Sequence, residues 1–193
     1  MYPADDELER YAALLEGSGR YRVLRRFEGP RRYAEEDGSA LHRGVYLDVE
    51  TTGIDAASDE LIELAMVPFE YSGAGRIYSV GEAFTGLRDP GRPLPPFIRG
   101  LTGLSDDDLR GQSIDPDEVA AFLEGVSLIV AHNAGFDRPF FEKAFPDLTG
   151  FPWACSAREV PWRSYGVEGR KLEYIAYRAG VFFDGHRALV DCE

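Results

Sequence analysis

The chain has 193 residues, an apolar fraction of 44% and a formal net charge of −13. This length suits one catalytic domain with an extension, and the absence of a long apolar run excludes a membrane-spanning segment. The charge argues against tight, sequence-independent wrapping of duplex DNA, because such binding draws on many Lys and Arg contacts to phosphate. Two cysteines without metal-ligand spacing or a disulfide framework favour a reduced, cytoplasmic protein.

Residues 1–43 are predicted to form an N-terminal extension with one amphipathic helix. The helix is expected from Asp5 to Leu15, because apolar residues recur there with the spacing of one helical face, and Gly17 ends it. The extension holds 8 Arg and 9 acidic residues, so it is less acidic than the rest. We expect packing on the domain, with a basic arm that is either an ordinary solvated surface or a contact for nucleic acid: Arg20, Arg22, Arg25, Arg26, Arg31 and Arg32.

The signals for strands and helices become regular from residue 44 onward, where a second domain, 44–193, is predicted. Helices are expected after the cap and proline at Asp115 and Pro116, and near the end from about Arg187. Three early strands followed by alternating helix and strand imply a mixed sheet flanked by helices. The predicted strands are 44–50, 61–69, 77–84, 127–131 and 153–156, with a hairpin link at 73–75, and two further helices cover 134–145 and 171–179.

One of these helices contains a proline and a candidate site residue. Pro139 fits only if it sits in the first turn, where a missing N–H does no harm. That placement puts Asp137 near the helix N-terminus, where the dipole favours a carboxylate. Asn133 is a candidate cap for the same helix.

Asp48 and Glu50 are two carboxylates in a strand that is otherwise apolar. Side chains in a strand alternate between faces, so the two point the same way. Like charges at that separation on a partly buried surface repel and lose hydration. Bound cations would neutralise them, and acidic oxygens suit hard cations such as Mg²⁺ or Mn²⁺.

Three stretches of the chain share a pattern with a known family. They are Asp48-Val49-Glu50-Thr51-Thr52-Gly53, His132-Asn133-Ala134-Gly135-Phe136-Asp137, and Gly185-His186-Arg187-Ala188-Leu189-Val190-Asp191. In this order they resemble the motifs of the DnaQ-like 3′–5′ exonucleases, in the branch with a catalytic histidine. The resemblance covers residues 44–193 and implies a ribonuclease H-like fold, a mixed five-stranded sheet with helices on its faces.

The resemblance also implies a mechanism for phosphodiester hydrolysis with two metal ions. Asp48, Glu50, Asp137 and Asp191 would hold the two Mg²⁺ or Mn²⁺ ions, with Asp48 as the bridging ligand. His186 would take a proton from the attacking water, since its ordinary pKa lies near neutrality. Because His186 and Asp191 are five residues apart, they do not share a helical face, so we expect His186 in the loop before the helix, with Gly185 giving that loop room to bend.

Other residues in the three stretches are weaker candidates. By the same resemblance, Thr51, Gly53 and Asn133 would lie near the terminal nucleotide, and Ile54 would press on its base. As single residues, Thr51 and Gly53 could equally be turn residues. His132 and Phe136 are better explained as structural, and Asp55 and Asp59 as ordinary solvated surface acids.

The predicted substrate is a single-stranded 3′ end, from which nucleoside 5′-monophosphates are released. The resemblance to proofreading subunits favours DNA, and an RNA-trimming exoribonuclease of the same family is the first alternative, because discrimination depends on contacts to the 2′-OH. An inactive nucleic-acid-binding module is the alternative from another class. A DNA polymerase or repair protein is a candidate partner.

Only Cys192 and Glu193 follow the last motif residue, Asp191. A helix begun near Arg187 would have about seven residues, too few for stability without packing. The resembled family continues this helix further, so we expect a chain that is cut short there, with Asp191 in a fraying last turn.

Overall fold

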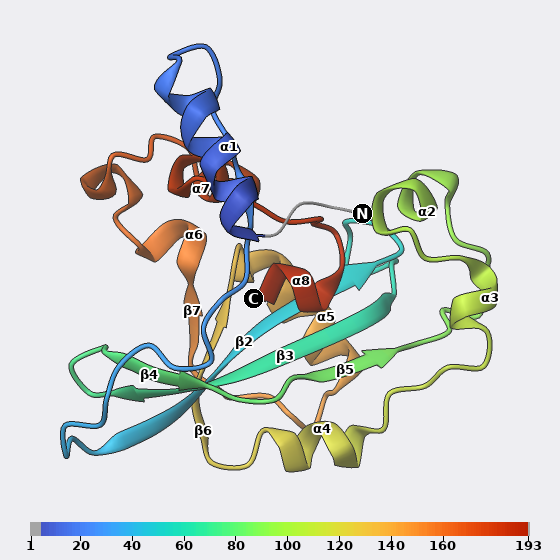
Figure 1. Cartoon of the computed structure of the whole chain (residues 1–193). Helices are drawn as coiled ribbons and strands as arrows, with labels where there is room; N and C mark the ends of the chain where they lie inside the picture. Colours follow the sequence, from blue (N-terminus) through green and yellow to red (C-terminus); the bar gives the residue numbers. More distant parts are fainter. Residues whose placement is uncertain (1–4, 193) are drawn as a thin grey trace.

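The computed structural model describes residues 5–192 of the chain, and residues 1–4 and Glu193 lie outside the described part. Figure 1 shows a central twisted sheet with helices on both of its faces. The strands run in the order β4-β3-β2-β6-β7, and β5 also pairs with β3. The prediction of a mixed sheet flanked by helices is confirmed. Its six strands are β2 (Leu41–Thr51), β3 (Leu61–Ser72), β4 (Ile77–Val80), β5 (Phe84–Leu87), β6 (Val126–Ala131) and β7 (Trp153–Cys155).

The sheet has six strands rather than the predicted five because the expected strand at 77–84 is divided. Residues 77–80 form β4, residues 81–83 belong to no strand, and β5 begins at Phe84; both strands pair antiparallel with β3. The division falls beside Pro68 of β3, which has no N–H for a ladder. Gly81 donates its N–H to the Pro68 carbonyl at 2.8 Å, and the chain then leaves the ladder. The hairpin between β3 and β4 is confirmed.

The central strand β2 is antiparallel to β3 and parallel to β6, which makes the sheet mixed. Val45, Leu47 and Val49 lie on one face and are at most 3% exposed. They pack against α4 (Pro116–Phe122) and α5 (Ala134–Ala144). The main core therefore lies on this face of the sheet.

The beginnings of α4 and α5 test two of the predictions. Asp115 caps α4 as predicted and accepts a hydrogen bond from the backbone N–H of Asp117 at 2.9 Å. Asn133 does not cap α5 with its side chain, because it lies in the left-handed region with φ 80°. Pro139 is the sixth residue of α5 and not in its first turn, so that prediction was wrong. The proline ring removes one helical hydrogen bond, and the burial of Phe140 and its neighbours compensates for that loss.

Among the described residues, the backbone pairing of the N-terminal extension with the rest of the chain comes from the stretch after its helix. In α1 (Asp5–Gly17), Ala12 is buried, but Leu8, Tyr11 and Leu15 are 40–50% exposed, so the expected packing of its apolar face was wrong. The short strand β1 (Arg25–Arg26) pairs in parallel with β8 (Val181–Phe182). The chain then runs beside β4, where Val80 donates its N–H to the Arg31 carbonyl at 2.9 Å.

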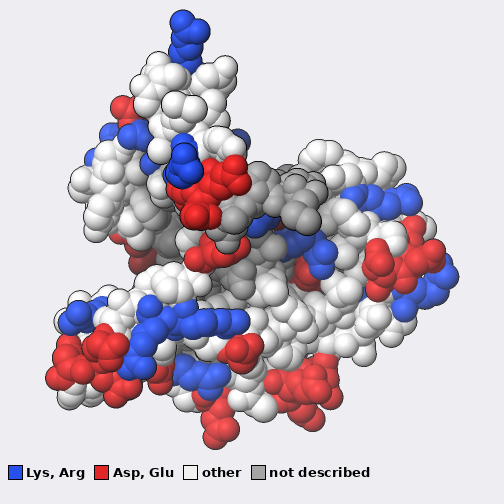
Figure 2. Space-filling model, viewed as in Figure 1, with Lys and Arg blue, Asp and Glu red and all other residues white. Residues whose placement is uncertain are grey.

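Most arginines of the basic arm have acidic or carbonyl partners within the described chain. Arg25 bonds to Glu9 at 2.7 Å and Arg26 to Asp184 at 2.9 Å. Arg22 donates to the carbonyl of Tyr177 and lies over its ring, Arg31 lies near Glu82, and Arg32 near Glu35 and Glu36. Acidic and basic side chains are interspersed on the face seen in Figure 2. The arm is therefore a largely paired surface.

The remaining helices surround the ends of the sheet. Gly180 (φ 85°) ends the penultimate helix as predicted. The last helix has five residues and packs across β2 and β3 through Ala188 and Cys192. None of the described helices is long and apolar enough to cross a membrane. The helices not yet given are α2 (Pro96–Thr102), α3 (Asp106–Leu109), α6 (Ser156–Glu159), a 3₁₀ helix (Trp162–Tyr165), α7 (Leu172–Ala179) and α8 (Ala188–Cys192). Of these, α7 is the helix that ends at Gly180, and α8 is the five-residue helix on β2 and β3.

Candidate active site

The end of β2 carries two acidic side chains on the face opposite the main core. Asp48 lies across from Ala65 of β3, and Glu50 lies across from Glu63. Glu50 is 9% exposed and Glu63 is 4% exposed, so both carboxylates are buried. The pairing register shifts between Glu50 and Thr51, and such irregularities re-aim side chains at the ends of strands. The same-face placement predicted for Asp48 and Glu50 is what the strand shows.

Asp137 reaches this end of β2 because β6 stops short of it. The last pair between β2 and β6 is Tyr46 with Val130, and α5 begins after a two-residue turn. The first turn of α5 therefore takes the position beside β2 that a longer β6 would occupy. Asp137 lies in that turn as predicted, is 2% exposed, and leaves its Oδ2 atom without a hydrogen-bond partner among the described residues.

The chain before α8 turns sharply and brings Asp191 to the same place. His186 is in the left-handed region with φ 67°, and its backbone N–H donates to Asp191 Oδ2 at 3.1 Å. We expected Gly185 to give the loop room to bend, but the left-handed residue is His186 itself. A Cβ atom at Gly185 would lie 3.2 Å from the Phe183 ring and 3.3 Å from Asp191 Oδ1, so a larger residue would crowd both side chains. His186 precedes α8 in a loop, as predicted.

Three of the five motif residues form a tight group. Ligand atoms of Glu50, His186 and Asp191 all lie within 4.8 Å of one another. The His186 side chain is 45% exposed, and its Nε2 atom is 3.8 Å from Glu173 Oε1. Asp48 and Asp137 approach this group closely enough to influence its charges. The structure thus gathers all five predicted residues from a strand, two helices and a loop.

Burial and mutual repulsion raise the pKa values of these acids. Burial, with the carboxylates of Asp191, Glu63 and Asp137, raises the pKa of Glu50 to about 8. Burial raises the pKa of Asp137 to about 7, although backbone N–H groups oppose the rise. The pKa of Asp48 is also well above its usual range, through burial and its acidic neighbours, and burial raises the pKa of Asp191. Such clustered shifts are typical of functional sites.

The donor set fits divalent cations. Asp137 Oδ2 and Asp191 Oδ1 are buried and have no hydrogen-bond partner within residues 5–192, and a buried polar atom without a partner is costly. A hard cation with a preference for oxygen ligands would satisfy both and would relieve the repulsion among the acids. Asp48, Glu50, Asp137 and Asp191 are thus able to hold such an ion.

The structure adds an ion pair that the sequence analysis did not single out. Arg187 donates hydrogen bonds from Nε and Nη2 to the Glu63 carboxylate, and the shortest of them joins Nη2 to Oε1 at 2.8 Å. The backbone N–H of Ala188 also donates to Glu63 Oε2 at 3.2 Å. The signal was available, because Glu63 interrupts an apolar strand in the same way as Asp48.

The turn after β2 is organised by Asp59. The Asp59 carboxylate accepts bonds from Thr52 Oγ1, the Asp55 N–H and Arg92. A side chain at Gly53 would lie 2.4 Å from Asp59 Oδ2, so this glycine makes room for Asp59. The expectation of a merely solvated surface residue was therefore wrong for Asp59. Asp55, which is exposed, accepts bonds within its own turn.

The weaker candidates lie in different surroundings. Thr51 is 5% exposed and its hydroxyl donates to the Gly53 carbonyl, so it shapes the turn. Ile54 is 89% exposed beside the site, and Asn133 is exposed at the start of α5. His132 uses both ring nitrogens for structural bonds, to Ser156 Oγ and the Arg170 carbonyl. Phe136 packs on the main core.

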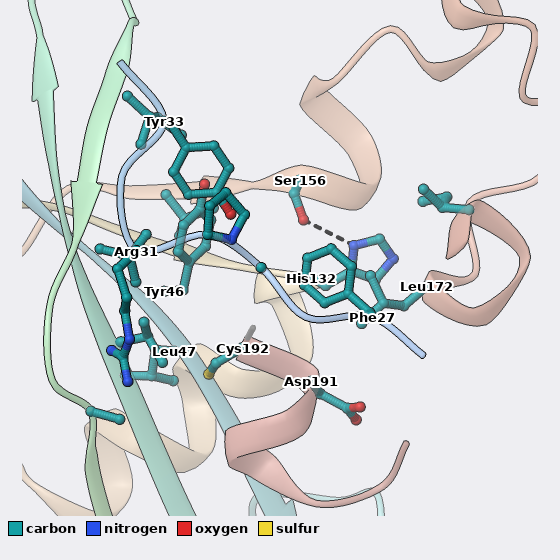
Figure 3. A pocket seen from close by; sticks show the side chains of 18 of the residues that line it. Phe27, Arg31, Tyr33, Tyr46, Leu47, His132, Ser156, Leu172, Asp191 and Cys192 are labelled. Atoms are coloured by element: carbon teal, nitrogen blue, oxygen red, sulfur yellow. Dashed lines mark hydrogen bonds between the residues drawn. The ribbon is translucent and has the colours of Figure 1, made fainter. Parts of the chain in front are cut away.

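A cavity of about 680 Å³ borders the site on the side of the N-terminal extension. Figure 3 shows Tyr33 of the extension near Tyr46 of β2, and Phe27 of the extension near His132 and Leu172, with Asp191 and Cys192 of α8 on the wall. Its lining is mostly apolar, in contrast to the acidic group beside it.

The geometry agrees with the comparison of the chain with known proteins. The family model for RNase T, described as an exonuclease, matches residues 45–193. The chain belongs to this exonuclease family. The prediction of a 3′–5′ exonuclease of the DnaQ-like kind is thus confirmed for family and enzyme class, and enzymes of this kind use divalent metal ions.

Two similar curated proteins are DNA polymerases much longer than this chain. The chain is 42% identical over 106 residues to the PolC-type DNA polymerase III of Bacillus subtilis, covering 54% of this chain and 7% of the polymerase. It is 28% identical over 152 residues to that of Clostridium perfringens, covering 76% of this chain and 10% of the polymerase. The chain therefore spans a tenth or less of the length of these relatives.

Two solved structures share the fold. E. coli exonuclease I, in a zinc-bound complex with single-stranded DNA, superposes with a TM-score of 0.60 and 16% identity over 78% of this chain and 38% of that one. Exonuclease X, in complex with a 5′-overhanging duplex DNA, gives a TM-score of 0.53 and 23% identity over 77% of this chain and 84% of that one. At these identities the likeness concerns the fold.

Proposed function

We propose that the chain is a divalent-metal-dependent exonuclease that removes nucleoside 5′-monophosphates from the 3′ end of single-stranded DNA. The observation that carries the proposal is the convergence of Asp48, Glu50, Asp137, His186 and Asp191 at the end of β2. An inactive binding module would have no use for four buried or half-buried acids that repel one another.

We assign two divalent metal ions, Mg²⁺ or Mn²⁺, to Asp48, Glu50, Asp137 and Asp191, which together would hold them. When bound, the ions supply positive charge to the phosphate and to the oxygen atoms that attack and leave. The unpartnered oxygens of Asp137 and Asp191 support this assignment.

We assign the general base to His186. The exposed imidazole accepts a proton at a ring nitrogen as the water oxygen bonds to phosphorus. The bond between phosphorus and the 3′ oxygen breaks, and that oxygen takes a proton from solvent. Glu173, which is close to Nε2, would stabilise the imidazolium that results.

We place the terminal nucleotide over the turn that follows β2. Ile54 is the exposed apolar side chain next to the acids and would contact the last base, and the backbone at Thr51 and Gly53 would lie along it. Asn133 borders the same end of the sheet and is kept as a candidate contact.

DNA is preferred over RNA in this proposal because the relatives are DNA polymerases and the solved exonucleases were studied with DNA. An exoribonuclease of the same family is the second candidate. A polymerase or repair protein stays the proposed partner, and a cytoplasmic location the proposed setting.

The test is digestion of DNA and RNA oligonucleotides of one sequence, labelled at the 5′ end, with Mg²⁺, Mn²⁺ or EDTA. We expect a ladder that shortens from the 3′ end of DNA, release of 5′-monophosphates, and no reaction in EDTA. Asp48→Asn controls for contaminating nucleases, and Asp107→Asn, an exposed acid on α3, is the matched substitution outside the site. Faster digestion of RNA would favour the second candidate, and no metal-dependent digestion of either would refute the proposal.

A further inference from the structure

The pair of Glu63 and Arg187 joins the middle of the sheet to the beginning of α8. Arg187 Nε lies 3.2 and 3.1 Å from the two Glu63 oxygens, and Nη2 lies 2.8 Å from Oε1. Two-pronged bonding of this kind fixes the orientation of both side chains. The Ala188 N–H adds a third partner to the same carboxylate.

Glu63 is placed where an apolar residue would stabilise the fold more readily. It is 4% exposed, its strand neighbours Leu61, Ile62 and Leu64 are fully buried, and it faces the acidic Glu50 across the strands. Replacing a buried ion pair with packed apolar residues is often neutral or stabilising. Fold stability is therefore a weak reason for an acid at this position.

The backbone on both sides of Arg187 is tied to a carboxylate. On one side the His186 N–H bonds to Asp191, and on the other side the Ala188 N–H bonds to Glu63. A helix of five residues does not hold its own shape in water. The start of α8 is held by the packing of Ala188 and Cys192, by the Glu63 bonds to Arg187 and Ala188, and by the bond between the His186 N–H and Asp191.

We propose that Glu63 and Arg187 are a pair of positioning residues for the nuclease site. Glu63 holds Arg187 and the first N–H of α8, and this places His186 and Asp191 against Glu50. The charge of Arg187 also offsets the repulsion between Glu63 and Glu50. The inference rests on the proposed exonuclease function, because it assigns the pair to the residues of that site.

The experiment compares Arg187→Ala, Arg187→Lys and Glu63→Gln with the unaltered protein. Arg76→Ala, which removes an ion pair with Asp37 far from the site in sequence and structure, is the matched control. For each protein, kcat and KM are measured on single-stranded DNA, Mn²⁺ binding by calorimetry, and hydrogen exchange at the His186 and Ala188 amides in EDTA.

For Arg187→Ala we expect kcat to fall about 10–100-fold and Mn²⁺ affinity to fall by a similar factor, as for other residues that orient metal ligands. KM for DNA should stay within about threefold, and exchange at both amides should accelerate. Arg187→Lys keeps the charge without the fork and should recover part of the loss. Glu63→Gln keeps an acceptor for the Ala188 N–H and should lose less than Arg187→Ala.

Adding Glu63→Gln to Arg187→Ala should restore part of the lost Mn²⁺ affinity, because the Glu63 carboxylate is then no longer buried without its partner. Unchanged kcat and Mn²⁺ affinity in Arg187→Ala, with only a lower Tm, would show a structural role and overturn the proposal. A rise in KM alone would place Arg187 on the DNA and overturn it too. Unaltered amide exchange would overturn the positioning role without reference to activity, whereas an inactive unaltered protein would overturn the exonuclease function itself.

Discussion

The two faces of β2 are built from alternate residues of one strand, and they differ completely in chemistry. On one face Val45, Leu47 and Val49 pack against the phenylalanines of α5. On the other face Asp48 and Glu50 meet further acids from β3, α5 and α8, and their pKa values are raised by burial and repulsion. The first face stabilises the fold, and the second face stores unfavourable interactions.

The comparison shows how one strand can serve both purposes. Each buried apolar side chain contributes about 1.5–3 kcal/mol, and the contribution depends on removal from water and not on partner identity. The stabilising free energy from the apolar side chains on the α5 face allows the opposite face to keep carboxylates that no protein group neutralises fully. Substitutions on the acidic face should therefore affect activity, and substitutions on the apolar face should affect stability.

The largest effect is expected from Asp48→Asn. The change removes one of the carboxylates that would hold the metal ions, so nuclease activity should be abolished. In EDTA the melting temperature of the variant should fall less steeply with rising pH than that of the unaltered protein, because the variant has one buried acid fewer to ionise. Activity is measured with labelled single-stranded DNA and unfolding by circular dichroism. Near-normal turnover would contradict the metal assignment.

His186→Ala should lower kcat by about 10²–10⁴-fold, the usual range for loss of a general base. Mn²⁺ binding should be largely kept, and the acidic limb of the pH–rate profile should change shape. Calorimetry with Mn²⁺ and rates over a pH series check this. Loss of Mn²⁺ affinity with an unaltered profile would make His186 a ligand, which its place in the group with Glu50 and Asp191 also permits.

Phe141→Ala tests the apolar face. Phe141 is fully buried between Phe145 and Trp153, and its truncation should cost about 3–5 kcal/mol of unfolding free energy. The activity of the folded fraction should change little. Urea unfolding measures the loss, and Phe97→Ala, at a side chain that is 74% exposed, is the control expected within about 0.5 kcal/mol. A large loss of kcat without loss of stability would reverse the roles of the two faces.

The raised pKa of Glu50 predicts how stability depends on pH. Its usual pKa of 4.5 becomes about 8 in the folded protein, so between these values the folded state binds more protons than the unfolded state. The unfolding free energy in EDTA should therefore decrease as pH rises through this window. Asp137, whose pKa is raised to about 7, should make this decrease steeper below about pH 7. Mg²⁺ should reverse the decrease by binding the folded state. Urea titrations with EDTA or Mg²⁺ across this range test it, and stability that rises with pH in EDTA would contradict the crowding of the acids.

The smallest effect is expected from the extension, where Arg25 and Arg26 already have acidic partners. The double substitution Arg25→Ala with Arg26→Ala should change KM by less than about twofold. Each phosphate contact with single-stranded DNA would contribute about 0.7 to the slope of log affinity against log salt, so the slope should stay unchanged. A decrease in the slope by the amount of one or more phosphate contacts would show that the arm binds the DNA substrate.

The sequence predicted the parts of the fold that follow from local pattern. Alternation placed Asp48 and Glu50 on one face, and the cap and proline at Asp115 and Pro116 located the start of α4. Predictions from local sequence pattern were wrong where tertiary contacts determine the bounds or the packing of an element. Pro68 of β3 divided the expected third strand, Pro139 stayed inside α5 because the phenylalanines beside it are buried, and the apolar face of α1 stayed exposed.

The sequence by itself determined which residues approach the end of β2, since Asp48, Glu50, Asp137, His186 and Asp191 stand in motifs whose order and spacing are those of the exonuclease family. Only the tertiary structure decided that Glu63 faces Glu50 and is held by Arg187, because strand register and the docking of α8 bring together residues 124 positions apart. Motif spacing encodes short-range geometry along the chain. The pairing of distant charges depends on how the packed elements meet, and one sequence read along its length does not specify that.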